Sequence, residues 1–342
     1  MTYKLDLRDK RIIYELDTNS RKSLSDISKK LGMSKQVVAY RVQRLLDNNI
    51  IQKFLMVIDV AKLGYTPYKI LLRLRNVNRE KESEIVEFLR NHPFVEWLSS
   101  TDGNFDMNFN ILAESALHLY NQLKDLEARF GDYIAEMDTN VMVLASFYPR
   151  DYMIQEKRQQ RVFKAENPVT FGSKPETFLL DETDKSILSI LASDARTTTT
   201  EISEKLKISR NTVKSRIKQM EKSNVIQGYT IVLNNEKLEQ MHYKILITLH
   251  HLSKERAESL DWFIARHPNI WFSNKSIGNF DIEANIEVKN AAQFREIILE
   301  FKEKFSDIIT NYNVLQMYRI NKFHFYPMAK IEHRNNDQPF NY

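Results

Sequence analysis

Apolar residues near the N-terminus recur at helical spacing in three short stretches. Residues 8–17, 24–31 and 35–48 each place apolar side chains three or four positions apart, which predicts three amphipathic helices around one core. The turn "LGMS" separates the second helix from the third, and there Gly32 suits a positive φ and Ser34 suits a helix N-cap. Two helices joined by so short a turn predict a helix-turn-helix.

After about residue 65 the period of the pattern changes to two. The segments "YKILLRLRN", "FVEWLSST", "FDMNFNILA" and "YIAEMDTNVMV" alternate as strands do, with helical segments before the second and the fourth. The order β-α-β-β-α-β predicts a ferredoxin-like sheet with both helices on one face. We expect one set of residues in the third strand to face the helices, namely Phe105, Met107, Phe109 and Ile111, matched in a second copy by Phe280, Ile282, Ala284 and Ile286.

The whole pattern occurs twice. Gly-Asn-Phe-Asp (GNFD) begins at Gly103 and again at Gly278, 175 residues later, and the same offset aligns "LDLRDKRIIYEL" with "LDETDKSILSIL". One register held over most of the chain indicates a tandem duplication of a unit of about 145 residues. The predicted fold class is therefore α+β, with two winged-type helix-turn-helix domains and two ferredoxin-like βαββαβ domains in a tandem repeat.

We expect six segments along the chain. These are a first helix-turn-helix domain (1–60), a first ferredoxin-like domain (65–150), a linker (151–178), a second helix-turn-helix domain (179–235), a second ferredoxin-like domain (240–328) and a disordered tail (329–342). The linker begins charged and Gln-rich and then carries Pro and Gly, as connecting segments do.

The composition and motifs exclude several kinds of chemistry but say less about the fold. The 342 residues include no Cys, which excludes disulfides, thiolate zinc sites and Cys nucleophiles. The eight His form no HExxH or other metal-ligand spacing, and no GxSxG, P-loop or dinucleotide fingerprint is found, so we expect neither an enzyme nor a cofactor. With no apolar run of membrane-spanning length and no apolar signal region at the N-terminus, we expect a cytoplasmic protein without a membrane partner.

The helix after each predicted turn carries side chains that suit double-stranded DNA. Arg and Lys bind guanine edges and phosphates, and Gln and Asn bind adenine; the alternative is that both helices are merely solvated faces. The second helix is the more basic, because Lys214 and Ser215 stand where the first has Ala39 and Tyr40, so we expect copy two to bind DNA more strongly. The candidate DNA-binding residues are Ser34, Lys35, Gln36, Tyr40, Arg41, Arg44, Ser209, Arg210, Asn211, Thr212, Lys214, Arg216 and Lys218.

This domain order resembles the Lrp/AsnC (feast/famine) family of transcriptional regulators. The matching features are "LDxxDxxI" at the start of each copy, Arg21, Ser34, Val38 and Arg41 in the helical part, the "IQ" that follows it, and the G-x-F-D loop. The resemblance implies that the helix-turn-helix binds DNA. It also implies that the ferredoxin-like domain, called RAM, dimerises through its helix-free sheet face and binds an amino-acid effector near the GNFD loop. Family members usually carry one unit per chain, so the duplication leaves the oligomeric state open, although a homo-oligomer is expected.

The two GNFD loops have two possible roles. Carried over from the resemblance, the candidate effector-binding residues are Asp102, Gly103, Asn104, Asp106, Gly278, Asn279 and Asp281. A purely structural role also suits the sequence, because Gly permits a tight turn and Asn and Asp can close it through side-chain-to-backbone hydrogen bonds.

Duplication suggests that the two RAM domains pair within one chain. The helix-free face of the first copy is richer in basic residues, and that of the second is richer in acidic residues. Our hypothesis is an intrachain pseudo-dimer supported by this charge complementarity, with Arg73 and Glu283 as a specific pair.

Two other functions stay open. One is an architectural, chromatin-like protein that binds DNA without an effector. The other is an enzyme similar to the siroheme decarboxylases, which look similar in fold and occur as paired subunits, although the Arg- and aromatic-rich sequence expected for a large anionic tetrapyrrole is missing.

Overall fold

The computed structural model of the chain describes residues 4–154, 169–172, 178–250 and 253–326. The predicted linker is therefore described only in part, as the 3-10 turn η3 (Asp151–Met153) and the short strand β6 (Val169–Phe171). The predicted disordered tail, 329–342, lies outside the described residues.

Each repeat begins with the three predicted helices, here called a head. The helices are α1 (Leu7–Thr18), α2 (Leu24–Leu31) and α3 (Lys35–Asp47) in the first head, and α6 (Glu182–Ser193), α7 (Thr199–Leu206) and α8 (Arg210–Lys222) in the second. Asp6 and Asp181 start the first helix of each head through reciprocal capping boxes, which satisfy backbone N–H groups that the helix leaves open.

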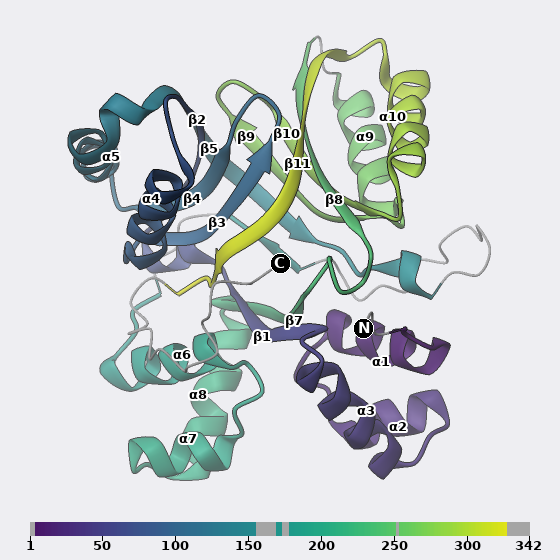
Figure 1. Cartoon of the computed structure of the whole chain (residues 1–342). Coiled ribbons are helices and arrows are strands. Elements are labelled where there is room, and N and C mark those ends of the chain that lie inside the picture. Colours follow the sequence, from purple (N-terminus) through teal and green to yellow (C-terminus); the bar gives the residue numbers. More distant parts are fainter. Residues whose placement is uncertain (1–3, 155–168, 173–177, 251–252, 327–342) are drawn as a thin grey trace.

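One two-stranded ribbon joins the heads (Figure 1). Strand β1 (Ile51–Ile58) follows α3, β7 (Ile226–Leu233) follows α8, and the two pair antiparallel with each other. Both strands are buried along most of their length, because the helices cover one side and the RAM domains the other. A single apolar core therefore runs through both heads and the ribbon.

Each RAM domain has the predicted β-α-β-β-α-β order, so the predicted fold class is confirmed. The first contains β2 (Thr66–Leu74), α4 (Arg79–Asn91), β3 (Val95–Asp102), β4 (Met107–Ala113), α5 (Ala116–Phe130) and β5 (Ile134–Phe147). The second contains β8 (Met241–Leu249), α9 (Lys254–Arg266), β9 (Ile270–Ile277), β10 (Ile282–Val288), α10 (Ala291–Phe305) and β11 (Ile309–Phe323). Two further 3-10 turns are η1 (Val60–Leu63) and η2 (Gly131–Tyr133).

The two RAM sheets close on each other. Strand β11 pairs with β3 and β5 pairs with β9, while the β2–β5 and β8–β11 pairings complete each sheet. These eight strands therefore form a closed ring, with the helices of each repeat outside it and the helix-free faces inside (Figure 1). Closure leaves no open edge among these eight strands, which removes the usual site of strand-to-strand aggregation.

The alternation predicted for the third strand of each RAM domain is correct for the strand and wrong for the residue before it. Met107, Phe109 and Ile111 face the helices of the first RAM domain, as predicted, and so do their counterparts in the second. Phe105 and Phe280 instead lie inside the ring, in a small apolar cluster that contains residues of both repeats. The reason is that both precede their strand, where the turn at glycine breaks the two-residue period.

Candidate nucleic-acid interface and effector loops

Helices α3 and α8 begin in the same way. The hydroxyl oxygens of Ser34 and Ser209 accept a backbone N–H of their own first turn at 3.2 Å and 3.0 Å. The preceding turn contains a left-handed residue in both heads, Gly32 at φ 63° and Lys207 at φ 55°. Lys207 therefore keeps the turn shape of glycine, at a conformational cost of about 1 kcal/mol.

Most of the candidate DNA-binding side chains face solvent. Three residues bury the apolar side of each helix, Val38, Val42 and Leu45 in α3 and Val213, Ile217 and Met220 in α8. The exposed candidates on the opposite side are Lys35, Gln36, Tyr40, Arg210, Asn211, Thr212, Lys214 and Lys218. Within the part of the chain that the structure describes, Arg210, Lys214 and Lys218 make no ion pair, so α8 presents three unneutralised cations.

Three candidate arginines are instead bound to the start of the first helix of their own head. Arg41 Nη1 lies 2.8 Å from Asp6 Oδ2 and 2.7 Å from Asp9 Oδ1, and Arg44 Nη2 lies 3.0 Å from Asp9 Oδ2. In the second head Arg216 Nη1 lies 2.6 Å from a carboxylate oxygen of Asp181. The hydrogen bond to Asp6 raises the pKa of Arg41, and that to Asp181 raises the pKa of Arg216. Their charges are thus partly neutralised within the head, and copy one retains fewer free cations than copy two.

Reciprocal arginines hold the two heads together. Arg21 Nη1 donates to the backbone oxygen of Ala195 at 2.5 Å, and Arg196 Nη1 donates to that of Ser20 at 2.6 Å. The two arginines lie 175 positions apart, so the heads are related by a pseudo-twofold arrangement. The repeat register in the sequence aligns these two arginines. It does not show that each of them contacts the other copy.

The aspartates of the GNFD loops hold the loops to the first strand of their own sheet. The Leu74 N–H donates to Asp106 Oδ2 at 2.6 Å, and the Leu249 N–H donates to Asp281 Oδ2 at 2.7 Å. These carboxylates accept backbone hydrogen bonds at the end of the first strand, so they anchor the loop to a neighbouring strand and do not close the turn itself, which is the role that the sequence suggested.

The rest of each loop contacts the other repeat. Asn104 Nδ2 donates to Asn313 Oδ1 at 2.7 Å, and the Asn279 N–H donates to Asn140 Oδ1 at 2.6 Å. Of the remaining candidates, Asp102 is exposed at the rim of the first loop. The structure thus brings the seven effector candidates together as two separate loops, each seated on the last strand of the opposite RAM domain.

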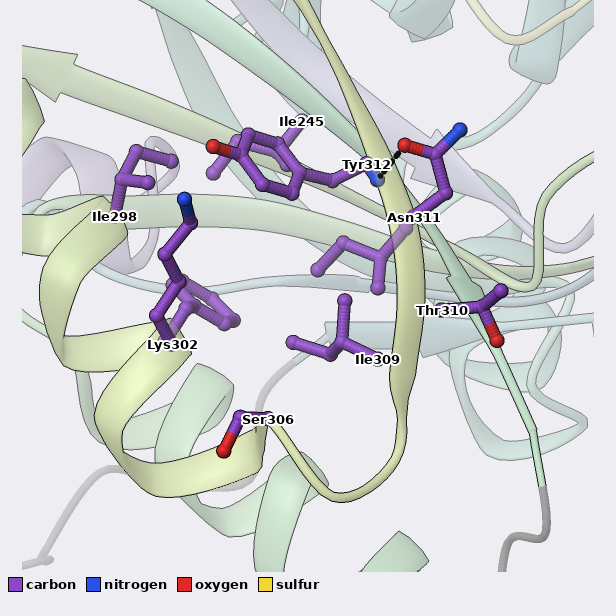
Figure 2. Close-up of a pocket in the computed structure, with 10 residues that line it drawn as sticks. Ile245, Ile298, Lys302, Ser306, Ile309, Thr310, Asn311 and Tyr312 are labelled. Atoms are coloured by element: carbon purple, nitrogen blue, oxygen red, sulfur yellow. Dashed lines mark hydrogen bonds between the residues drawn. The ribbon is translucent and has the colours of Figure 1, made fainter.

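A pocket of about 330 Å³ lies in the second RAM domain, between α10 and the strands β8 and β11 (Figure 2). It is lined by Ile245, Ile247, Ile298, Phe301, Lys302, Ser306, Ile309, Thr310, Asn311 and Tyr312. None of the predicted effector residues is among them. Among the described residues, no group of three acidic or His side chains is arranged for a metal ion, and no helix is long and apolar enough to cross a membrane.

Comparison with known proteins identifies the family. A winged helix-turn-helix DNA-binding model matches residues 5–52 and 180–227, which is the start of each repeat. The HTH-type transcriptional regulator FL11 of Pyrococcus horikoshii is 31% identical over 123 residues, which is 36% of this chain and 80% of FL11. The uncharacterized HTH-type transcriptional regulator PF1231 of Pyrococcus furiosus is 33% identical over 142 residues, 42% of this chain and 93% of its own length. The chain belongs to the Lrp/AsnC family of transcriptional regulators.

The complete two-repeat architecture also resembles that of a protein of known structure. The siroheme decarboxylase NirDL superposes with a TM-score of 0.58 over 92% of both chains, at 14% sequence identity. At this identity the likeness concerns the fold alone. FL11 and PF1231 match about one repeat of this Lrp/AsnC regulator, whereas NirDL matches both.

Inside the strand ring, this Lrp/AsnC regulator holds charged groups that sequence reasoning did not identify as buried. Lys69 of the first repeat lies 3.1 Å from Glu283 of the second, and Lys244 lies 2.7 Å from the same carboxylate. All three are essentially without solvent contact. The predicted pair of Arg73 and Glu283 is wrong, because Arg73 pairs with Glu136 of its own sheet near the surface. The predicted complementarity between a basic first copy and an acidic second copy is nevertheless present in the contact of Lys69 with Glu283.

Proposed function

We propose that the protein is a sequence-specific transcriptional regulator whose two heads bind two different half-sites on double-stranded DNA. The observation that carries the proposal is the pairing of two unlike recognition helices on one ribbon. Helix α3 exposes Lys35, Gln36 and Tyr40, whereas the matching surface of α8 exposes Arg210, Asn211 and Ser215. A single chain therefore carries the two heads that a symmetric dimer would supply as identical copies, and its preferred site is asymmetric.

The chemistry of α8 supports the dominant role proposed for the second head. Arg210 and Asn211 begin the helix, where side chains reach base edges, and a bidentate contact of this kind discriminates between bases by about 1–3 kcal/mol. Lys214 and Lys218 follow on the same exposed side and suit phosphates. We therefore expect most of the sequence preference to come from the half-site under α8.

Footprinting on the DNA upstream of the protein's own gene, followed by titration of the protected site, tests this proposal. Arg210→Ala and Asn211→Ala should each weaken specific binding about tenfold or more, and Lys35→Ala and Gln36→Ala should weaken it less. Lys275→Ala, which removes a half-buried cation paired with Asp261 in the second RAM domain, serves as the control for net charge. Equal losses from both heads would contradict the dominance of copy two.

An architectural, effector-independent DNA-binding protein is the main alternative within DNA binding. Binding that depends only on phosphates falls steeply with salt and differs little between sequences. A salt titration that compares the footprinted site with random DNA of equal length separates the two. A ratio of affinities near one at every salt concentration would favour the architectural function.

We further propose that the RAM domains respond to a small effector, an amino acid or a related molecule. The GNFD loops support this because each has exposed residues and contacts the opposite repeat, so a ligand there would touch both RAM domains. Repeating the footprint with a panel of amino acids tests it, and a footprint that no member alters would count against an amino-acid effector at the loops.

A siroheme decarboxylase remains the second candidate function, because NirDL shares the two-repeat fold. Two lysines inside the ring, Lys69 and Lys244, are bound to Glu283 and are not available to the carboxylates of a tetrapyrrole. Mixing the purified protein with siroheme and recording its absorbance decides the matter. A saturable spectral shift followed by loss of carboxyl groups would replace the regulatory proposal with an enzymatic one.

The assembly and location follow from the DNA-binding proposal. We infer that one chain is the functional equivalent of a family dimer, since the RAM faces that would pair between chains pair within it. Light scattering of the purified protein tests this. With DNA as its proposed partner, we also propose that the protein acts in the cytoplasm.

A further inference from the structure

The pocket of the second RAM domain has an apolar floor and a polar rim (Figure 2). Ile245, Ile247, Ile298 and Phe301 are buried, and they form the floor together with the half-buried Ile309. The rim consists of Lys302 and Ser306 from the end of α10, and of Thr310, Asn311 and Tyr312 from β11. A volume of about 330 Å³ lies within the range of small-molecule sites, which are typically apolar with a few fixed polar groups.

Among the described residues that line the pocket, Lys302 is the only charged one. Its ammonium lies 5.3 Å from the centre of the Tyr312 ring and points across the pocket mouth toward that side chain. Among the residues that the structure describes, no carboxylate forms an ion pair with Lys302. Its neighbour on the helix, Lys304, differs in this respect because it pairs with Glu300. The pocket therefore offers one uncompensated positive charge beside apolar surface.

In the first repeat the matching floor residues are also apolar, but the charge at the matching rim is reversed. Its matching floor residues, 175 positions earlier, are Ile70, Leu72, Leu123, Leu126 and Ile134, all apolar. At the rim, Glu127 replaces Lys302, Glu136 replaces Asn311 and Met137 replaces Tyr312. Both glutamates have cationic partners within their own repeat, Lys124 and Arg73. Among the described residues, the rim of the second repeat therefore presents a cation without an ion-pair partner, and the cations at the rim of the first repeat are paired.

We propose that this pocket binds a small monocarboxylate with an aliphatic body and no ammonium group. The carboxylate would pair with Lys302, with the Ser306 hydroxyl as a further donor, and the aliphatic body would cover the isoleucines. An amino acid fits less well, because the described lining residues include no carboxylate to bind its ammonium group.

The position of the pocket connects it with the contact between the repeats. Asn311 lies opposite Thr248 in the β11–β8 register, and Thr248 Oγ1 donates to the backbone oxygen of Asn279 at 3.2 Å. Asn279 in turn binds Asn140 of the first RAM domain. The pocket is thus an effector site separate from the GNFD loops, and its assignment rests on the effector part of the proposed function. It adds a ligand class and places the site in the second repeat.

Isoleucine methyl NMR of the full chain, without DNA, tests the proposal with three probes that share one carbon skeleton. The probes are 4-methylpentanoate, its neutral amide 4-methylpentanamide, and L-leucine, which adds the ammonium group. We expect 4-methylpentanoate to shift the methyl signals of Ile245, Ile247, Ile298 and Ile309, while those of Ile70 and Ile134 in the first repeat stay in place. The acid should bind at least about tenfold more tightly than the amide or L-leucine, as expected for one charge-assisted hydrogen bond.

Variants of two lysines on the same helix complete the test. Lys302→Met should weaken binding of 4-methylpentanoate about tenfold, Lys302→Glu should abolish it by restoring the rim of the first repeat, and Lys304→Met should leave it unchanged. Tighter binding of L-leucine than of the acid, absence of shifts at millimolar acid, or equal losses at both lysines would overturn the proposal. Because DNA is absent, these outcomes leave the DNA-binding proposal standing, and failure of DNA binding would not alter them.

Discussion

Arg150 and Glu287 form a buried ion pair between the end of the first repeat and the second RAM domain, with Arg150 Nε 2.8 Å from Glu287 Oε2. Arg150 Nη1 also lies 2.7 Å from Asp17 Oδ1 in α1. One arginine therefore ties the first head to the sheet of the other repeat. The residues that match Asp17 and Glu287 in the duplicated register are Ala192 and Leu112, so the corresponding tie at the second head cannot form.

Replacing Arg150 with Met should destabilise the protein strongly. Removal of one member of a buried ionic group leaves the others unpaired, and the expected loss is about 3–5 kcal/mol of unfolding free energy, measured by urea denaturation. Burial already raises the pKa of Asp17, so without the arginine this carboxyl will bind a proton more readily. The control is Arg73→Met, which breaks an ion pair near the surface and should cost little. Similar losses for the two variants would mean that Arg150 does not act as a buried tie.

The same variant should loosen one head more than the other. Because only α1 is bound through Arg150, Arg150→Met should speed amide hydrogen exchange in α1 and leave α6 near its original rate. Exchange followed by mass spectrometry resolves the two helices. Equal acceleration in both would indicate that the heads open as one unit through the shared ribbon.

Glu96 should make stability depend on pH near neutrality. Burial raises the pKa of this carboxyl to about 7, from an ordinary value of 4.5. The folded chain therefore holds a proton that the unfolded chain releases, and the resulting stability, complete below pH 4.5, is lost as the pH rises to about 7. Glu96→Gln removes this dependence, so the variant should gain about 3 kcal/mol relative to the original protein between these pH values. Urea denaturation over pH 4.5–7.5 measures it, and parallel curves would refute the shifted pKa.

The sequence predicted the helices, strands and repeats of this molecule better than the contacts between them. Apolar spacing identifies which face of an element is buried, and the repeat register then supplies the second copy. Neither pattern says which other element covers the buried face. Lys69 alternates like a solvent-facing strand residue, yet it lies inside the ring because a second sheet covers it. The same limit explains Phe105, whose partners Leu246 and Leu315 are more than a hundred residues away.

The three charges of Lys69, Lys244 and Glu283 should respond unequally to mutation. Burial alone would raise the pKa of Glu283, but the nearby ammonium groups of Lys244 and Lys69 hold that pKa below its ordinary value. Glu283→Gln leaves two buried cations without an anion, whereas Lys69→Met leaves one cation beside one anion. We therefore expect a loss of about 3–5 kcal/mol for Glu283→Gln and a clearly smaller loss for Lys69→Met in urea denaturation. A larger loss for Lys69→Met would show that the pairing with Lys244 alone cannot hold the carboxylate.

Replacing either GNFD glycine with alanine should destabilise the protein, but we expect a second mutation to restore stability at only one of the two positions. Gly103 has φ 132° and Gly278 has φ 151°, so alanine strains the backbone at either, by about 1–3 kcal/mol. The added Cβ at 103 would also meet the backbone oxygen of Val314 at 2.7 Å, and that at 278 would meet the side-chain oxygen of Asn140.

Shortening a neighbouring side chain can relieve the second clash but not the first. Asn140→Ala should therefore recover part of the stability lost in Gly278→Ala, even though it also removes the hydrogen bond from Asn279. Leu315→Ala, at the position that matches Asn140, should recover none of the loss in Gly103→Ala, because the obstructing atom is backbone. A double-mutant cycle of thermal unfolding measures both couplings. Rescue of both glycine variants would show that the loops can move away from the opposite repeat, and rescue of neither would show that backbone strain alone requires glycine.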